Sequence, residues 1–358
     1  MSPLAPELLE TPTGVALPLN SATHQHHLDD NPEPASARRQ TCVAEEKRWA
    51  LILAGGDGAR LRGLTELISG DDRPKQFCRV FGPHSLLEQT RQRAARSVRP
   101  RQTIVALTRT HDRFYEQDQG PAASLRLIQP SNRGTAPAII LSLQHIMAQD
   151  PDALVAILPS DHYYSDEAAF NASLESAFGM ARTHRESIVL LGAKAQNPAM
   201  ELGWIEIGPA AGLNLFRVRG FEEKPARPLA ERLFVSGALW NTFVMVGHAS
   251  AFLWMSFVTL PKLVAVLDLS LPQCDEHGDL VVPACTYETI PTKDFARDVL
   301  TFNAHRLLAL RLQQLEWYDL GRPDRVISVV RSWGKELPSW IPAWEGAQRG
   351  AHRPLYQS

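Results

Sequence analysis

The sequence predicts an α/β fold with a mostly parallel sheet and helices on both of its faces. Short runs rich in Ile, Val and Leu, bounded by turn residues, alternate with amphipathic stretches along the chain. Repetition of strand, helix and strand in this order is typical of parallel sheets. A length of 358 residues with 44% hydrophobic and 21% charged residues allows a full core and excludes collagen-like, coiled-coil and wholly disordered chains.

The first half of the chain supplies the clearest elements. Five short apolar runs are predicted as buried strands: Trp49–Ala54, Thr103–Thr108, Leu125–Gln129, Leu154–Leu158 and Ser187–Leu191. Three longer amphipathic stretches are predicted as the helices between them: Ser85–Val98, Ala136–Gln149 and Asp166–Arg185.

The pattern is looser after residue 200. We expect a strand pair, Gly203–Gly208 and Asn214–Phe221, joined across Pro209 to Gly212. Further strands are expected near Thr242–Val246 and Arg306–Arg311, with helices over 226–234, 249–258 and 293–300. This half is predicted to extend the same sheet and to add a lid or platform, with no separate domain.

Both ends of the chain differ in composition from the middle. Residues 1–47 are rich in proline and lack an apolar period, which predicts a disordered extension. Its cluster of His24, His26 and His27 is typical of a solvated tail more than of a metal site. Residues 333–358 are predicted as a tail in which Trp340 and Trp344 pack irregularly, so the folded domain is expected over 48–332.

The charge and the cysteines restrict the partners and the location. A formal net charge of −2 provides no global field for nucleic acid or for an anionic membrane, so an anionic ligand needs a local cluster of cations. The four cysteines show no CxxC pairing, no apolar stretch reaches the ~20 residues that span a bilayer, and no secretory signal is seen. These features favour a cytoplasmic protein.

A glycine-rich loop is the most informative segment. The apolar run Leu51–Leu53 leads directly into Ala54, Gly55, Gly56, Asp57 and Gly58. Glycine lets the backbone approach a ligand closely, and consecutive N–H groups can then point at phosphate oxygens. The following residues supply the cations of a local anion site: Arg60, Arg62, Arg73 and Lys75.

The residue pattern of this loop differs from those of two common phosphate-binding loops. The Walker pattern is excluded because no lysine follows Gly58. The dinucleotide fingerprint GxGxxG is incomplete, since leucine stands at the third glycine, and the second strand ends at Thr108 and Arg109 without an acid for a ribose hydroxyl. An NAD-dependent oxidoreductase is therefore the weaker hypothesis. An ordinary strand-to-helix turn also becomes less favoured with Arg60 and Lys75 close by.

Several motifs in one order resemble those of a known family. The loop Leu53–Leu61, followed by Arg73-Pro74-Lys75-Gln76-Phe77, is similar to the signature of sugar-phosphate nucleotidyltransferases, especially mannose-1-phosphate guanylyltransferases. Four later segments agree: Arg133-Gly134-Thr135-Ala136-Pro137-Ala138, Leu158-Pro159-Ser160-Asp161-His162, Phe221-Glu222-Glu223-Lys224-Pro225 and Glu316-Trp317-Tyr318-Asp319-Leu320-Gly321. The resemblance covers residues 48–332.

The resemblance implies a Rossmann-like three-layer sandwich with a mostly parallel mixed central sheet. It also implies a reaction in which the phosphate oxygen of a sugar 1-phosphate attacks the α-phosphorus of a nucleoside triphosphate and pyrophosphate leaves. Carried over residue by residue, it gives Arg60 and Lys75 as catalytic cations at the triphosphate. Ala54, Gly55, Gly56, Gly58, Arg133 and Ala136 are implied to bind the nucleotide.

The remaining implied residues bind the sugar phosphate and a metal ion. Gly203, Glu223, Lys224 and Asn241 match the sugar-phosphate site. Asp161 and Asp319 match the ligands of Mg²⁺, which prefers carboxylates and substrate phosphates. On the sequence alone, Asp161 is also placed to cap a helix. His162 is expected to pack or to hold a ligand in place, and not to bind the metal itself.

The sequence departs from the family at positions that affect specificity. Gly134 stands where asparagine is usual, Gly63 stands where proline is common, and Thr242-Phe243 replaces a Ser-Gly pair. A non-catalytic homologue that binds a sugar nucleotide and regulates a partner is the alternative to the enzyme, and the intact Arg60, Lys75, Asp161, Lys224 and Asp319 argue against it. The sugar, the base and the oligomeric state, a homo-oligomer included, stay open.

Overall fold

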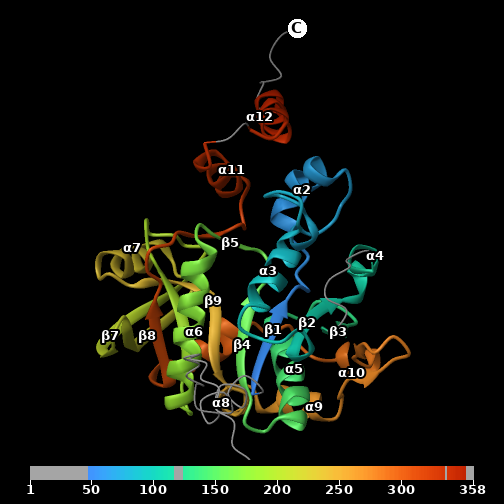
Figure 1. Cartoon of the computed structure of the whole chain (residues 1–358), viewed down its shortest axis with the longest axis vertical. Helices are drawn as coiled ribbons and strands as arrows, with labels where there is room; N and C mark the ends of the chain where they lie inside the picture. Colours follow the sequence, from blue (N-terminus) through green and yellow to red (C-terminus); the bar gives the residue numbers. More distant parts are fainter. Residues whose placement is uncertain (1–46, 117–123, 335–336, 352–358) are drawn as a thin grey trace, which may run out of the picture. The chain divides into compact units, whose positions relative to one another are not determined.

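The structure is a computed structural model that describes residues 47–116, 124–334 and 337–351 (Figure 1). The predicted disordered extension 1–47 lies outside the described residues apart from Lys47. All the described residues belong to one contact unit, which begins at Val43.

An eleven-stranded mixed sheet forms the centre of the fold. Its strand order is β10-β11-β3-β2-β1-β4-β9-β6-β12-β8-β7. The parallel strands β3 (Leu125–Gln129), β2 (Thr103–Thr108), β1 (Arg48–Leu53) and β4 (Leu154–Pro159) lie next to one another. Their carboxyl ends therefore share one edge. Beyond them, β9 (Leu239–His248) runs antiparallel between β4 and β6 (Ile188–Lys194), and β12 (Leu307–Arg311) is again parallel to β6.

Alternation of side chains along the central strands produces two cores. On β1, Leu51 packs into one apolar cluster and Ile52 into the other, and both are fully buried, as expected for a strand covered on both faces. The first cluster contains α5 (Thr135–Gln149), α8 (Ala249–Thr259) and α9 (Pro261–Asp268). The second contains α3 (Leu86–Ala94), α6 (Glu167–Thr183) and α7 (Arg227–Val235). The predicted three-layer α/β fold is confirmed.

The second half extends the sheet as predicted, with differences in detail. The strands β7 (Gly203–Gly212) and β8 (Leu215–Glu223) pair antiparallel, but residues 209–212 belong to β7 and not to the connection. Irregularities in the pairing let β7 continue past Pro209, and the turn falls at Leu213 and Asn214, which has a φ of 55°. The hairpin of β10 (Gln273–Cys274) and β11 (Leu280–Val281), which extends the other edge, was not predicted.

A small second sheet of two strands carries His162 and Asp319. Strand β5 (His162–Tyr164) pairs antiparallel with β13 (Trp317–Asp319), so that His162 lies opposite Asp319. Three-residue strands give too little periodicity to be recognised in a sequence. The other elements not yet named are α2 (Arg62–Ser69), α4 (Asp112–Tyr115), α10 (Ala284–Tyr287), α11 (Pro323–Ser332), α12 (Trp340–Ala351), the π-helix η5 (Ala296–Leu300) and the 3-10 helices η1 (Ala59–Leu61), η2 (Lys75–Phe77), η3 (Pro100–Gln102), η4 (Arg109–His111) and η6 (Thr301–Arg306).

The C-terminal segment corrects one expectation. We predicted irregular packing after residue 333, yet Trp340–Ala351 form helix α12. Its Trp340 and Trp344 pack against a third apolar cluster that includes Leu61, Leu64 and Val329. Among the described residues no single helix is long and apolar enough to cross a membrane, and only α8 with α9, bent by 119°, pass that test as a pair on length and composition.

Candidate active site

A cavity of about 380 Å³ opens at the carboxyl ends of β1, β2, β3 and β4. In open α/β sheets this edge is where ligands bind. Nine of the residues predicted for the site line it: Gly55, Gly56, Gly58, Arg60, Lys75, Asp161, Glu223, Lys224 and Asp319. The fold therefore brings together residues from five separate sequence motifs.

The glycine loop is held in place through its carbonyl groups. The Gln76 side chain donates hydrogen bonds of 2.8 Å to the carbonyls of Ala54 and Gly56, and the Thr108 hydroxyl donates to the carbonyl of Gly55 at 2.9 Å. A Cβ on Gly55 would lie 2.8 Å from Thr108 Oγ1, so only glycine fits against β2 there. Gly58 has a φ of 60° and caps η1, which carries Arg60.

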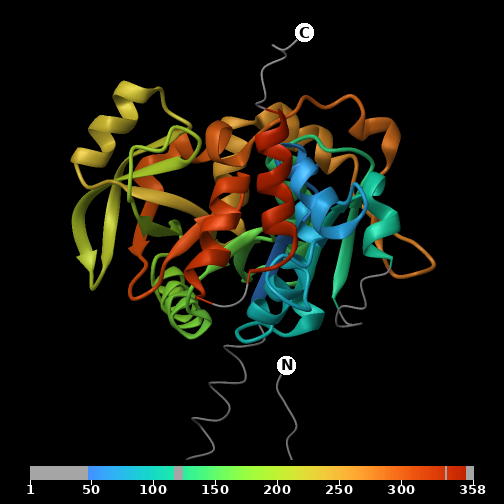
Figure 2. The same cartoon turned by 90° about the horizontal axis from the view of Figure 1, so that it is seen from above.

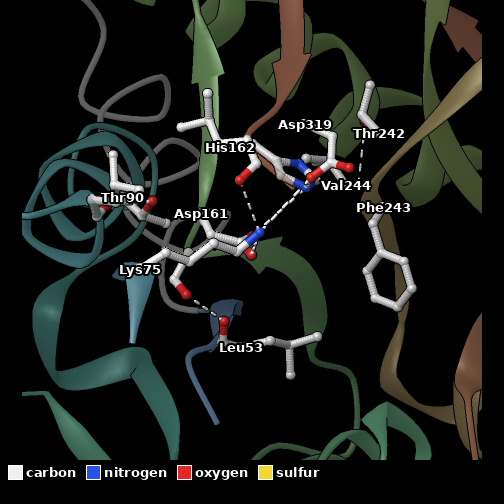
Figure 3. A network of polar contacts seen from close by, with 12 residues as sticks. Leu53, Lys75, Thr90, Asp161, His162, Thr242, Phe243, Val244 and Asp319 are labelled. Carbon is white, nitrogen blue, oxygen red and sulfur yellow. Dashed lines mark hydrogen bonds and ion pairs between the residues drawn. The ribbon is translucent and has the colours of Figure 1, made fainter. Parts of the chain in front are cut away.

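The ammonium of Lys75 lies close to two carboxylates, those of Asp161 and Asp319 (Figure 3). Its Nζ is 2.7 Å from Asp161 Oδ2 and 3.9 Å from Asp319 Oδ1. Burial acts to lower the pKa of Lys75, but the two carboxylates outweigh it and hold the pKa above its usual value. Burial likewise acts to raise the pKa of Asp161, and the positive charge of Lys75 reverses this, so its pKa lies below the usual value. Both groups therefore stay charged at neutral pH.

His162 is oriented toward the same carboxylates. The indole N–H of Trp317 donates to His162 Nδ1 at 3.2 Å, and because an indole only donates, Nδ1 must be the acceptor. The proton of the neutral ring then sits on Nε2, which is 3.6 Å from Asp161 Oδ1 and 3.9 Å from Asp319 Oδ1. Burial lowers the pKa of His162 despite the two carboxylates, so the ring is neutral. Its Nε2 faces both acids at a distance longer than a hydrogen bond.

The two acids fit a magnesium ion by their donor chemistry. Among the described residues no group of three or more His, Cys, Asp and Glu side chains forms a metal cluster. Mg²⁺ does not need one, because it is usually held by one or two carboxylates together with water and substrate phosphates. Asp161 and Asp319 both face the ammonium of Lys75, so this position already favours a cation. Oxygen atoms of these two residues would hold the ion beside the glycine loop.

Glu223 and Lys224 form the other side of the cavity. Lys224 Nζ is 2.8 Å from Glu223 Oε1, and Lys224 has a left-handed φ of 52° at the end of β8. Burial raises the pKa of the Glu223 carboxyl, an effect that Lys224 opposes. Behind them, a Cβ on Gly203 would lie 2.6 Å from Glu223 Oε2 and 3.2 Å from Asn241 Cβ. Glycine at 203 thus makes room for the Glu223 carboxylate.

Five of the predicted residues do not line the cavity: Ala54, Arg133, Ala136, Gly203 and Asn241. Ala54 and Ala136 are buried in the two cores, and the side chain of Arg133 donates to the carbonyl of Glu288 at 3.0 Å. The Asn241 side chain accepts from the backbone N–H of Phe243 at 3.1 Å. These residues shape the walls of the cavity from behind.

Other lining residues were not predicted from the sequence. They are Leu53, Gln76, Ala106, Gln129, Asn132, Gly134, Thr135, Ala138, Pro159, Ser160, His162, Phe243 and Asp294. Gln129 and Ser160 sit at the ends of β3 and β4, where the rule about carboxyl ends could have found them. Asp294 gave no such signal. It reaches the cavity because Lys293 exchanges backbone hydrogen bonds with Arg133 and Ala136.

The fold and this site define a class of protein. The family model described as "Nucleotidyl transferase" matches residues 49–335, and the chain belongs to this family. The resemblance to sugar-phosphate nucleotidyltransferases is thereby confirmed.

Two curated proteins are similar in sequence to this chain. The alginate biosynthesis protein AlgA of Pseudomonas syringae pv. tomato is 32% identical over 310 residues, which are 84% of this chain and 59% of AlgA. Mannose-1-phosphate guanylyltransferase RfbM of Salmonella typhimurium is 32% identical over 212 residues, 57% of this chain and 42% of RfbM. The chain spans about half the length of the curated relatives it matches.

A solved structure agrees with the fold. The crystal structure of mannose-1-phosphate geranyltransferase from Thermus thermophilus superposes with a TM-score of 0.67 at 27% sequence identity. The match covers 81% of this chain and 80% of that chain.

Proposed function

We propose that this chain transfers the guanylyl group of GTP to mannose 1-phosphate, giving GDP-mannose and pyrophosphate. The family supports transfer of a nucleotidyl group to a sugar phosphate. The choice of GTP and mannose rests on the sequence motifs and on relatives such as RfbM. GDP-mannose made in this way would serve polysaccharide assembly, in line with the relative AlgA, an alginate biosynthesis protein.

One observation carries the proposal. A single cavity is lined by a glycine loop, by Arg60 and Lys75, by the acids Asp161 and Asp319, and by the Glu223–Lys224 pair. A transfer between two phosphorylated substrates needs cationic and amide groups for both and an acidic site for a metal ion. A protein that only bound a sugar nucleotide would not need the metal and leaving-group residues together.

The chemistry follows from these positions. An oxygen of the sugar 1-phosphate attacks the α-phosphorus, the bond from the α-phosphorus to the bridging oxygen breaks, and its electron pair leaves with pyrophosphate. The glycine loop, Arg60 and Lys75 hold the triphosphate and neutralise charge that moves to the leaving group. Mg²⁺ bound by Asp161 and Asp319 would neutralise phosphate oxygens. Because the protein holds both reactants in line, the reaction becomes effectively unimolecular.

The sugar phosphate is assigned to the Glu223–Lys224 side. Lys224 Nζ lies 2.8 Å from Glu223 Oε1, so the ammonium and the carboxylate lie together on this side of the cavity. A phosphate that enters competes for the ammonium, which frees Glu223 to accept hydrogen bonds from sugar hydroxyls. Gly203 and Asn241 support Glu223 from behind.

A panel of reactions tests the proposal. Purified protein is given each of five nucleoside triphosphates with several sugar 1-phosphates and Mg²⁺, and pyrophosphate release is measured. GTP with mannose 1-phosphate should give the highest kcat/KM, and Asp161→Ala should lose it. Glu276→Gln, which removes an exposed carboxylate far along the chain on the β10–β11 hairpin, is the matched control and should keep full activity.

The other outcomes distinguish the alternatives. If another nucleotide or sugar is the best substrate, nucleotidyl transfer stands as the reaction and the proposed specificity for GTP and mannose is wrong. Absence of turnover with every pair, together with binding of a sugar nucleotide, indicates the regulatory homologue. Full turnover by Asp161→Ala would show only that Asp161 is not a metal ligand. Electron paramagnetic resonance of bound Mn²⁺ tests that assignment separately.

We also propose a cytoplasmic location. The thiols of Cys78 and Cys274 are not joined in a disulfide, as a reducing compartment allows. Nucleoside triphosphates are the substrates that such a location would supply.

A further inference from the structure

Helix α12 lies beyond residue 335, where the match to the family model ends, yet it packs near the phosphate loop. The third apolar cluster joins Leu61 and Leu64, from η1 and α2, to Val326 and Val329 on α11. Trp340 and Trp344 of α12 pack against this cluster. Figure 2 shows the red helix α12 alongside the blue helix α2. The helix thus covers the segment that directly follows the glycine loop.

Trp344 meets α2 at a glycine. A Cβ built on Gly63 would lie 3.5 Å from Cζ3 and 3.8 Å from Cη2 of the Trp344 ring, which is ordinary contact. A longer side chain at 63 would extend from that Cβ against the ring. Because Gly63 follows Arg60 by less than one helical turn, the ring restrains the part of the chain that carries Arg60.

Helix α12 is also tied to helix α11, which follows Asp319 in the chain. Glu345 pairs with Arg331 on α11 at 2.5 Å. On the same helix α11, Arg325 Nη1 lies 3.5 Å from Asp319 Oδ2. Helix α12 therefore connects the helix after the phosphate loop with the helix after the second predicted metal ligand.

We propose that Trp344 is a positioning residue for the phosphate loop. Its ring rests on Gly63 and holds α2, and through α2 it fixes Arg60 at the nucleoside triphosphate. Trp344 itself touches no substrate. The effect on catalysis rests on the proposed function, but the effect on α2 does not.

Hydrogen exchange tests the effect on α2 without reference to activity. In Trp344→Ala, backbone amides of residues 62–69 should exchange about tenfold faster, while those of α5 keep their rates. Trp344→Phe, which keeps a ring on Gly63, should restore most of the protection. Trp254→Ala, which removes another partly exposed tryptophan on α8, is the matched control and should leave α2 unchanged. Unchanged exchange of α2 in Trp344→Ala would overturn the proposal.

A double-mutant cycle tests whether the contact with Gly63 is the cause. Gly63→Leu alone should raise the exchange of α2 because the new side chain displaces the ring. In the Trp344→Ala background the same change should add little, since the ring is gone. Additive effects of the two substitutions would overturn the assignment to this contact.

Kinetics separate positioning from a general loss of structure. Trp344→Ala should raise KM for the nucleoside triphosphate about tenfold and leave KM for the sugar phosphate within about twofold. A fall in kcat alone, in proportion to the folded fraction, would indicate a structural role and overturn the proposal. If the unmodified protein shows no turnover, the proposed function fails, and the exchange experiment still decides the role of Trp344.

Discussion

The ammonium of Lys75 lies 2.7 Å from Oδ2 of Asp161, where the end of β4 meets the segment after the phosphate loop. The pair keeps both groups charged in a largely buried place, because each offsets the burial of the other. It also holds a cation where Asp319 is within 3.9 Å. A triphosphate with its metal ion would enter between these charges, so Lys75 is placed to exchange a carboxylate for a phosphate oxygen.

Replacing Lys75 tests its role at the triphosphate. Lys75→Met should lower kcat about a hundredfold or more, because the charge at the leaving group is lost. Lys75→Arg keeps the charge but has a planar guanidinium, so it should recover only part of the activity. Steady-state kinetics with both substrates varied measures this. Equal activity of Lys75→Met and the unmodified protein would remove Lys75 from the reaction.

The pH dependence tests Glu223. Burial raises the pKa of this carboxyl, so it binds a proton at a pH where an ordinary glutamate is ionised. A protonated Glu223 accepts sugar hydroxyls less well, and kcat/KM for the sugar phosphate should therefore fall on the acid side at a higher pH than a free glutamate would give. In Glu223→Gln, this decrease of kcat/KM on the acid side should be absent.

The same pKa has a consequence for stability. Because the folded-state pKa lies above the unfolded one, the folded protein binds the proton more tightly, and this contribution to stability is lost as the pH rises through the folded pKa. Glu223→Gln should therefore be more stable than the unmodified protein at neutral pH, as thermal unfolding would show. A less stable Gln variant would contradict this sign.

Gly203 tests the support behind the sugar-phosphate site. A Cβ there would lie 2.6 Å from Glu223 Oε2, so Gly203→Ala should push the carboxylate into the cavity. We expect KM for the sugar phosphate to rise about tenfold or more. Gly179→Ala on α6, where a Cβ meets nothing within 4 Å, is the matched control and should keep activity. An unchanged KM in Gly203→Ala would show that Glu223 is not held there.

Gly134 tests the contact that brings Asp294 to the cavity. Its φ is 81°, and a Cβ would lie only 2.2 Å from the carbonyl oxygen of Lys293. Gly134→Ala should lower the free energy of unfolding by about 3 kcal/mol. Gly70→Ala, at φ 76° and ψ 6° with open surroundings, gives the cost of a left-handed conformation without a clash and should cost about 1 kcal/mol. Gly134, at φ 81° and ψ −177°, adds both the clash and a conformation that only glycine adopts readily. Equal losses in denaturant unfolding would show that neither the Lys293 contact nor the backbone conformation of Gly134 requires glycine.

Regular elements could be predicted because their pattern is local. Strand β2 matches the predicted Thr103–Thr108, and helix α5 differs by one residue at its start. The strands β5 and β13 were missed because each has three residues and exists only through its partner. Helix α12 was missed because its proline and two glycines are typical of a tail. The contact of Trp344 with Gly63 that accompanies it joins residues distant in sequence.

The candidate site shows the same division. Residues that directly follow predicted strands, such as Asp161 after β4, could be placed at the cavity in advance. The resemblance added Glu223, Lys224 and Asp319, which local pattern alone would not join. Arg133 and Ala136 lie in a matching motif but point elsewhere, because their segment packs on Lys293 and Glu288.

Transfer of a labelled phosphorus atom tests the central claim most directly. With GTP radiolabelled at the α-phosphorus and mannose 1-phosphate, the label should appear in GDP-mannose and not in pyrophosphate. Label at the γ-phosphorus should appear in pyrophosphate. Transfer of the γ-label to the sugar, or α-label released as free GMP or GDP, would contradict nucleotidyl transfer by this chain.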